Sequence, residues 1–247
     1  MLLISKFRGF LFMFRLFFTP AWFNGWDVIF DLVGLLVAML IAAYSLRIYQ
    51  INKENKFAYL SLAFILLSLG LLFKTFTSSV FYFTPIRDTV ADVLRPVAGR
   101  GLAHSLVYYR SAFFFQMVSM LSGWLLIFFI SQKSRARLRK FHEVTQIALF
   151  LYLVLLVSIV SNFKFSVFYT TSAVLLGLIT LNYYKNYLNT NRNGKAFMVM
   201  FSFLLLLIGH LFLVFVSISN GLYVIGQAIT VLGFLLLLYT YRRITRK

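Results

Sequence analysis

Residues 28–77 read VIFDLVGLLVAMLIAAYSLRIYQINKENKFAYLSLAFILLSLGLLFKTFT. Two apolar runs, 28–46 and 57–77, flank a short polar stretch that contains Arg47, Lys53 and Lys56. An α-helix needs about 20 mostly apolar residues to cross the hydrocarbon core of a bilayer, and each run has that length. The stretch therefore predicts two membrane-spanning helices joined by a short basic turn.

The same pattern continues along the chain. Further apolar runs are found at 107–130, 146–161, 165–184, 197–217 and 222–241. The composition agrees, since 61% of the residues are hydrophobic and 12% are charged, against about 45–50% and about 25% in soluble domains. We therefore predict an all-α membrane protein, a seven-transmembrane-helix bundle that residues 1–247 form as a single transmembrane domain.

The charge is strongly basic, with 24 Lys and Arg against 6 Asp and Glu and a net charge of +18. Because the basic residues lie between apolar runs, we expect them to meet the anionic headgroups of a lipid bilayer, and we expect no nucleic acid. They gather on alternate connections: Arg47, Lys53, Lys56, Lys133, Arg135, Arg137, Arg139, Lys140, Lys185, Arg192, Lys195, Arg242, Arg243, Arg246 and Lys247. The positive-inside rule then predicts a multi-pass protein of the cell membrane, with its N-terminus outside and its C-terminus in the cytoplasm.

Two segments outside the runs allow more than one interpretation. Residues 1–26 form either an interfacial N-terminal segment, whose aromatic residues enter the membrane boundary, or a signal sequence whose apolar core is broken by Arg15. The long outer connection, 78–106, predicts a short amphipathic helix on the surface. That helix is either a simple connector or a lid over an outward-facing pocket.

The chain also resembles itself. Residues 46–73 align with 181–213, so that Phe64 pairs with Phe203, Gly70 with Gly209 and Phe73 with Phe212. The first three and the last three helices would then be parallel repeats joined by the fourth, a 3+1+3 internal repeat. Such repeats occur in some transporters and also fit a receptor-like bundle, so the repeat does not select a function.

Few polar side chains fall within the predicted spans. His210, Gln227 and Gln116 form a candidate intramembrane polar site. They either bind a ligand or sense pH, or they supply hydrogen bonds between helices. Asp31 and Arg110 are a candidate pair at the outer end: a structural salt bridge, the floor of an outward-facing polar cavity, or two side chains that reach water separately.

Missing residues and motifs argue against catalysis. The chain has no cysteine, no HExxH, GxSxG, GxxxxGK[ST] or GxGxxG motif, and histidines too far apart to share a metal. We therefore expect no enzyme, no metal and no cofactor. A microbial opsin needs a lysine in its last helix, and none lies between Gly221 and Tyr241. The PQ-loop class of sugar transporters has prolines and a Pro-Gln pair in its helices, and these spans have neither.

One stretch carries a family resemblance. SLRIYQINKENKFAYLSLAFILLSLGLLFK, residues 45–74, resembles archaeal seven-helix membrane proteins that look like the membrane-sensor region of some histidine kinases. The resemblance implies a non-enzymatic, sensor-like or scaffolding role. No output domain follows in the sequence, so the role would require a separate protein partner on the cytoplasmic side.

The cytoplasmic basic loop is the expected contact for such a partner or for lipid, although ordinary membrane anchoring also explains it. Its residues are Lys133, Arg135, Arg137, Arg139 and Lys140. The alternative function is a small-molecule transporter or transporter subunit. The oligomeric state is left open.

Overall fold

The computed structural model describes residues 19–83, 103–132 and 165–245, together with Pro85, Thr89 and Val154. Six helices in these ranges are long and apolar enough to cross a membrane, which confirms the prediction of a multi-pass helical membrane protein. They are α2 (Trp26–Asn52), α3 (Asn55–Tyr82), α5 (Ala103–Gln132), α7 (Phe165–Asn189), α8 (Gly194–Val214) and α9 (Gly221–Thr245), with short 3-10 helices η1 (Ala21–Phe23) and η2 (Phe215–Ser217).

Five of the six helices cover one predicted run each and most extend beyond it, whereas α8 covers 197–214 of the run 197–217 and η2 forms its last three residues. The fourth predicted run at 146–161 lies outside the described residues except for Val154, so a seventh span stays a prediction. The basic loop at 133–140, residues 1–18 and most of the outer connection also lie outside them.

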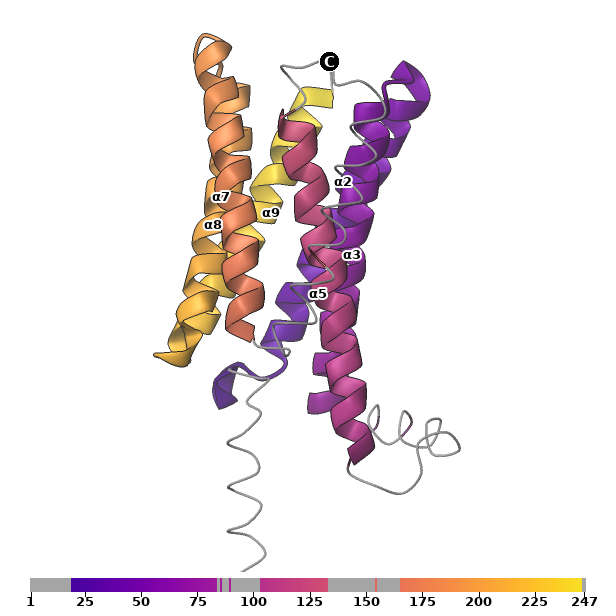
Figure 1. Cartoon of the computed structure of the whole chain (residues 1–247), viewed down its shortest axis with the longest axis vertical. Coiled ribbons are helices and arrows are strands. Elements are labelled where there is room, and N and C mark those ends of the chain that lie inside the picture. Colours follow the sequence, from indigo (N-terminus) through magenta and orange to yellow (C-terminus); the bar gives the residue numbers. More distant parts are fainter. Residues whose placement is uncertain are drawn as a thin grey trace, which may run out of the picture.

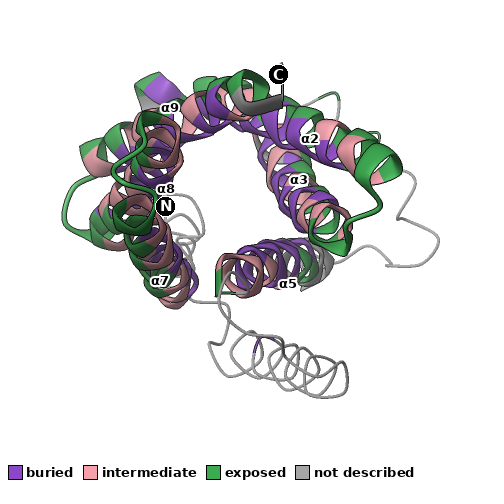
Figure 2. Ribbon diagram, turned by 90° about the horizontal axis from the view of Figure 1, so that it is seen from above, coloured by how far each residue is buried: buried purple, intermediate pink, exposed green. Residues whose placement is uncertain are grey.

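The six helices form a closed ring. They pack in the order α2, α3, α5, α7, α8, α9 and back to α2 (Figure 2). All run along the long axis of the molecule (Figure 1). Contacts are more extensive within a first group, α2, α3 and α5, and within a second group, α7, α8 and α9, than at the two junctions, α2–α9 and α5–α7.

Burial follows the pattern expected in lipid. Large apolar side chains cover the outside of the ring, where Leu36, Ile65 and Leu232 are about half exposed. Polar residues such as Asp31 and Gln227 are buried among the helices. A bilayer solvates apolar surface but not polar groups, so this distribution suits a membrane-spanning ring.

Local chemistry sets the ends of the first hairpin. Gly25 precedes α2 with φ of 89°, a conformation that favours glycine. The Oδ1 of Asp27, in the first turn of α2, accepts hydrogen bonds from the backbone N–H groups of Gly25 and Val28 at 3.1 and 3.0 Å, which pairs two donors that the helix itself leaves free. At the other end, Lys53 adopts the left-handed conformation and only Lys53 and Glu54 separate α2 from α3. The two helices therefore form a tight antiparallel hairpin.

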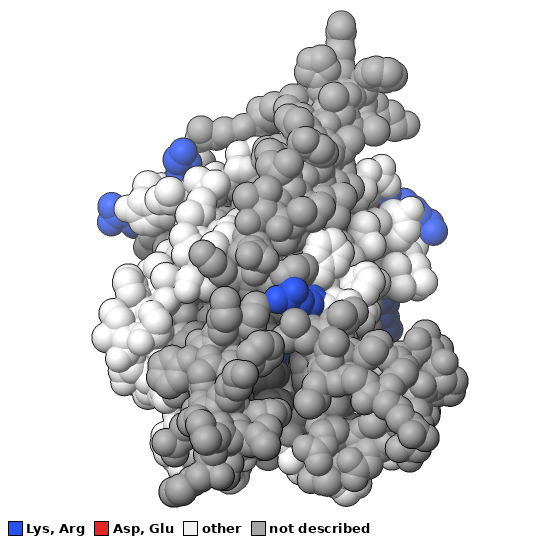
Figure 3. Space-filling view, turned by 60° about the horizontal axis from the view of Figure 1, so that its bottom comes forward, with Lys and Arg blue, Asp and Glu red and all other residues white. Residues whose placement is uncertain are grey.

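Most of the basic residues that the structure describes gather at one end of the ring. We call it the basic end, where α2, α7 and α9 end and α3 and α8 begin. Its described basic residues are Arg47, Lys53, Lys56, Lys185, Arg192, Lys195, Arg242 and Arg243. Figure 3 brings the opposite end forward, where α2 and α9 begin; its described residues show some Lys and Arg but no Asp or Glu, since Asp27 and Asp31 are buried.

Glycines bring the second and third helices of each group close together. A Cβ on Gly123 of α5 would lie 2.9 Å from the carbonyl oxygen of Ala63 in α3. A Cβ on Gly209 of α8 would lie 2.9 Å from the carbonyl oxygen of Gly226 in α9. Gly177 of α7 has no such neighbour. The α3–α5 and α8–α9 contacts therefore depend on the absence of a side chain.

Candidate functional site

The centre of the candidate site is a buried ion pair between α2 and α3. The Nζ of Lys74 lies 2.7 Å from the Oδ1 of Asp31, with 11% and 3% of the two side chains exposed. Ionised side chains are expensive inside a membrane and usually mark function there. The pair is therefore a candidate site and differs from an exposed salt bridge, which contributes little to stability.

Helix α9 reaches the ion pair from the second group. The Nε2 of Gln227 donates to the same Oδ1 of Asp31 at 3.0 Å and lies 3.4 Å from the hydroxyl of Tyr223. The Lys74 ammonium lies 5.8 Å from the centre of the Tyr223 ring, within range of a cation–π interaction. The ion pair thus ties α2 and α3 to α9 across the α2–α9 junction.

A second set of side chains comes from the remaining helices. The His210 ring of α8 lies 5.5 Å from the Tyr169 ring of α7 and 6.0 Å, edge to face, from the Trp124 ring of α5. The Nδ1 of His210 lies 2.9 Å from the Leu206 carbonyl oxygen. Phe234 of α9 links this set to the first, because it stacks on Trp124 and lies 3.9 Å from the position of a Cβ on Gly34, about one turn after Asp31 on α2. The two sets therefore belong to one region.

We call this region the polar core. It comprises one residue from each of the six described spans and Tyr223: Asp31, Lys74, Trp124, Tyr169, His210, Gln227 and Tyr223. No protein-family model, curated protein or solved structure matches the chain.

Toward the start of α2, a further polar contact flanks the polar core. The hydroxyl of Tyr82 donates to the Oδ2 of Asp27 at 3.1 Å. Loss of solvent on partial burial raises the pKa of Tyr82 to about 12. The hydroxyl therefore keeps its proton at neutral pH and remains a donor to the carboxylate.

Toward the basic end, aromatic and aliphatic side chains fill the ring. The side chains of Trp124 of α5 and Phe234 of α9 stack on each other across the helical ring. Their aromatic centroids are 6.1 Å apart, and both residues are buried. Leu67 and Leu206 pack at the same level with no exposed surface. The polar core is therefore bounded on that side by close-packed apolar residues.

The structure brings together two of the three predicted intramembrane residues. His210 and Gln227 both belong to the polar core, but they bond to different partners. Gln116 is buried, and its backbone carbonyl lies at the close approach of α5 to Gly70. No hydrogen bond between described residues joins the three side chains.

Of the three alternatives for Asp31 and Arg110, the salt bridge between them is not formed. The cation in contact with Asp31 is Lys74 rather than Arg110. Sequence reasoning missed Lys74 because it lies near the end of a predicted span, where a lysine usually reaches the interface. A signal was present all the same: Asp31 and Lys74 lie about equally far from the turn at Lys53–Glu54, and residues so placed in a tight helical hairpin face each other.

The described residues hold no metal-binding constellation. Among them, no three His, Asp or Glu side chains gather closely enough to hold an ion. The polar core combines a carboxylate, an ammonium group, an amide and an imidazole within aromatic walls. Such a set has the hydrogen-bonding groups and charges that a site for a polar molecule requires.

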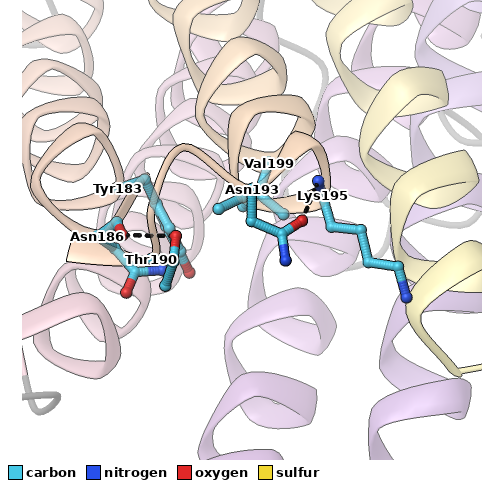
Figure 4. Close-up of a pocket in the computed structure, with 7 residues that line it drawn as sticks. Tyr183, Asn186, Thr190, Asn193, Lys195 and Val199 are labelled. Carbon is cyan, nitrogen blue, oxygen red and sulfur yellow. Dashed lines mark hydrogen bonds between the residues drawn. The ribbon is translucent and has the colours of Figure 1, made fainter. Parts of the chain in front are cut away.

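A separate cavity of about 270 Å³ lies at the basic end between α7 and α8. Figure 4 shows the residues that line it, with Asn193 accepting a hydrogen bond from the backbone N–H of Lys195 at 2.9 Å. Its lining residues come from the end of α7, the start of α8 and the turn between them: Tyr183, Asn186, Thr190, Asn193, Lys195, Ala196 and Val199. The cavity is remote from the polar core in the fold, because it adjoins the opposite ends of α7 and α8.

Proposed function

We propose that the chain is a non-enzymatic, sensor-like membrane protein. The polar core is its sensing site, and the basic end passes the response to a separate protein partner. One observation carries the proposal: the buried Asp31–Lys74 pair, bonded to Gln227, joins the two groups of helices inside the membrane-spanning bundle. A change at this pair alters the α2–α9 junction directly.

The packing supports the 3+1+3 repeat as part of this proposal. In the alignment Gly70 corresponds to Gly209, and both lie at the close approach of the second helix to the third. Leu67 and Leu206, which also correspond, lie against Gly123 of α5 and Gly233 of α9. The repeat implies a twofold axis along the bundle, with one junction at α2–α9 and its equivalent at α5–α7.

Hydrogen bonds near the basic end support the equivalence of the two junctions. The Ser45 hydroxyl of α2 donates to the Tyr241 hydroxyl of α9 at 2.9 Å. Asn182 of α7 donates to the Ser131 hydroxyl of α5, also at 2.9 Å. Each junction thus has a polar contact near the basic end, and at α2–α9 the polar core adds a second one. We propose that a shift at the polar core reaches Ser45 and Tyr241 along these two rigid helices.

The proposal also includes the location of the protein and its orientation in the membrane. We infer a cell-membrane location with the basic end in the cytoplasm, against anionic headgroups, and with residues 146–161 as a seventh span. Among the described residues, all Lys and Arg except Lys74 and Arg110 lie at one end of the ring, which supports this orientation. The resemblance to the membrane-sensor region of histidine kinases points to a partner that carries the output.

A transporter is the second candidate. The position of the polar core between the two groups of helices favours it, since transporters bind substrates where their repeats meet. The Trp124–Phe234 stack weighs against it, because it closes the path toward the basic end. A Leu206→Cys variant distinguishes a transporter from a sensor, because Leu206 is buried at the level of the Trp124–Phe234 stack. A transporter would expose this cysteine to a membrane-impermeant thiol reagent, and a sensor would not.

The sensor proposal is tested by distances at the basic end. Gln50 of α2 and Lys185 of α7 are exposed there, and the chain has no native cysteine. Spin labels attached to cysteines at these two positions report the distance between the two groups of helices. The distance is measured by pulsed electron paramagnetic resonance on the protein in nanodiscs. We expect Asp31→Asn to shift the distance distribution.

Ser61→Ala is the matched control. It removes a 2.9 Å hydrogen bond to the Ala42 carbonyl, which joins α2 and α3 within one group, and we expect it to leave the distance unchanged. Identical distributions in the wild type, Asp31→Asn and Lys74→Met would show that the polar core does not couple to the basic end.

A further inference from the structure

Four polar atoms around the polar core are buried without a hydrogen-bond partner in the described part of the chain. They are the Oδ2 of Asp31, the Nε1 of Trp124, the Oγ of Ser172 and the Nε2 of His210. The four residues are at most 3% exposed. Ser172 lies about one turn after Tyr169 on α7. Buried polar groups are nearly always paired, so this concentration of unpaired atoms asks for a binding partner.

The hydrogen-bonding character of these atoms can be assigned. The Leu206 carbonyl can only accept, so its contact with His210 places the proton on Nδ1 and leaves Nε2 as an acceptor. The Oδ2 of Asp31 is also an acceptor, whereas the Nε1–H of Trp124 is a donor. The Ser172 hydroxyl serves in either role. A fitting ligand therefore offers both donors and acceptors.

Charge balance narrows the class of ligand. Asp31 and Lys74 together are neutral. A simple cation at Asp31 would leave the site with a net positive charge, and a simple anion at Lys74 a net negative one. An uncompensated charge is costly in surroundings of low dielectric constant. A zwitterion adds one charge of each sign and keeps the site neutral.

The two unpaired acceptors, the Oδ2 of Asp31 and the Nε2 of His210, require a ligand with N–H or O–H donors, which narrows the class of zwitterion further. A quaternary ammonium zwitterion has no N–H and would leave both acceptors, Asp31 and His210, unpaired. A primary ammonium group has three N–H donors. The aromatic faces of Tyr169 and Tyr223 suit an ammonium group or an apolar substituent equally.

We infer that the polar core binds a small zwitterion with a primary ammonium group, a free amino acid. Its ammonium group would donate to the Oδ2 of Asp31 and to His210, and its carboxylate would accept from Lys74 and the Trp124 indole. The ligand thus replaces part of the direct Asp31–Lys74 contact. The inference rests on the proposed role of the polar core as a sensing site.

Tryptophan fluorescence tests the ligand class in the full chain. The chain has three tryptophans, and Trp22 and Trp26 are exposed. The double variant Trp22→Phe/Trp26→Phe leaves Trp124 as the only indole, inside the site. The protein in nanodiscs is titrated with alanine, glycine betaine, propylamine and propionate up to the millimolar range.

We expect a saturable change with alanine alone. Asp31→Asn should weaken it by about 100-fold, since it removes a charged partner of the ligand. The control is Asp27→Asn, which changes a buried carboxylate one turn earlier on α2 and should retain the response.

Three outcomes overturn the inference: glycine betaine binding as tightly as alanine, propylamine binding as tightly as alanine, or no saturable response to alanine. The ligand series on the unsubstituted polar core decides the class even if Asp31→Asn fails to fold. The two proposals can fail separately. If alanine does not bind but Asp31→Asn still shifts the spin-label distance, the ligand class is refuted and the sensor proposal stands.

Discussion

At the scale of the residue, the polar core depends on mutual neutralisation. Lys74→Met leaves the Asp31 carboxylate buried with Gln227 as its remaining partner. Breaking a buried ion pair in this way costs about 3–5 kcal/mol. We expect Lys74→Met to lower the thermal stability of the purified protein in detergent. The double variant Asp31→Asn/Lys74→Met should recover a large part of that stability, because it removes both charges.

Thermal unfolding followed by circular dichroism measures both variants. Ser61→Ala serves again as the control for losing an interhelical hydrogen bond without a charge. Equal losses of stability in the single and double variants would mean that charge compensation is not what holds the pair in place.

At the scale of the element, glycine determines how closely helices approach. Gly209→Ala places a methyl group against the Gly226 carbonyl and Thr230. The α8–α9 contact has to widen, and we expect a loss of about 1–3 kcal/mol, as for an overpacked core. Gly177→Ala on α7 is the matched control, since a Cβ there has no neighbour within 4 Å. Denaturation in detergent should separate the two variants, and equal stabilities would contradict the close packing of α8 on α9.

The positions of the membrane-spanning helices were the part of the structure that the sequence predicted best. Long apolar runs located all six described spans, because crossing a bilayer imposes a length that a sequence displays directly. The lengths of α2 and α3 were underestimated at both ends. Asn52 and Tyr82 are helical although they lie beyond the apolar runs, since helical hydrogen bonding continues into the interface wherever no residue stops it.

At the scale of the whole molecule, the ring predicts which segments face the same side. A cysteine at Lys53 should react with a membrane-impermeant thiol reagent only from the cytoplasm. A cysteine at Thr89 should react only from outside. Labelling intact cells and inverted vesicles measures both, and labelling of both positions from one side would refute the proposed topology.

The partnership within the polar core was the part that sequence alone did not predict. Candidates such as His210 and Gln227 could be selected because polar residues stand out in apolar spans. Their partners could not, since the α2–α9 contact depends on ring closure and α9 is far from α2 in the sequence. The pairing of Lys74 with Asp31 could have been predicted. A turn of only two residues, Lys53 and Glu54, joins α2 to α3, so residues about equally far from it face each other.

That turn has a consequence for how the protein enters the membrane. An unpaired Asp or Lys makes it costly for a single helix to enter the hydrocarbon core; the cost is about 2.5–3.5 kcal/mol at the helix centre and smaller toward the outer end, where Asp31 and Lys74 lie. Only Lys53 and Glu54 join α2 to α3, so the two helices can leave the insertion machinery as one hairpin. Asp31 and Lys74 then arrive at the same depth and enter lipid as a neutral pair. The spacing that forms the site also eases its biogenesis.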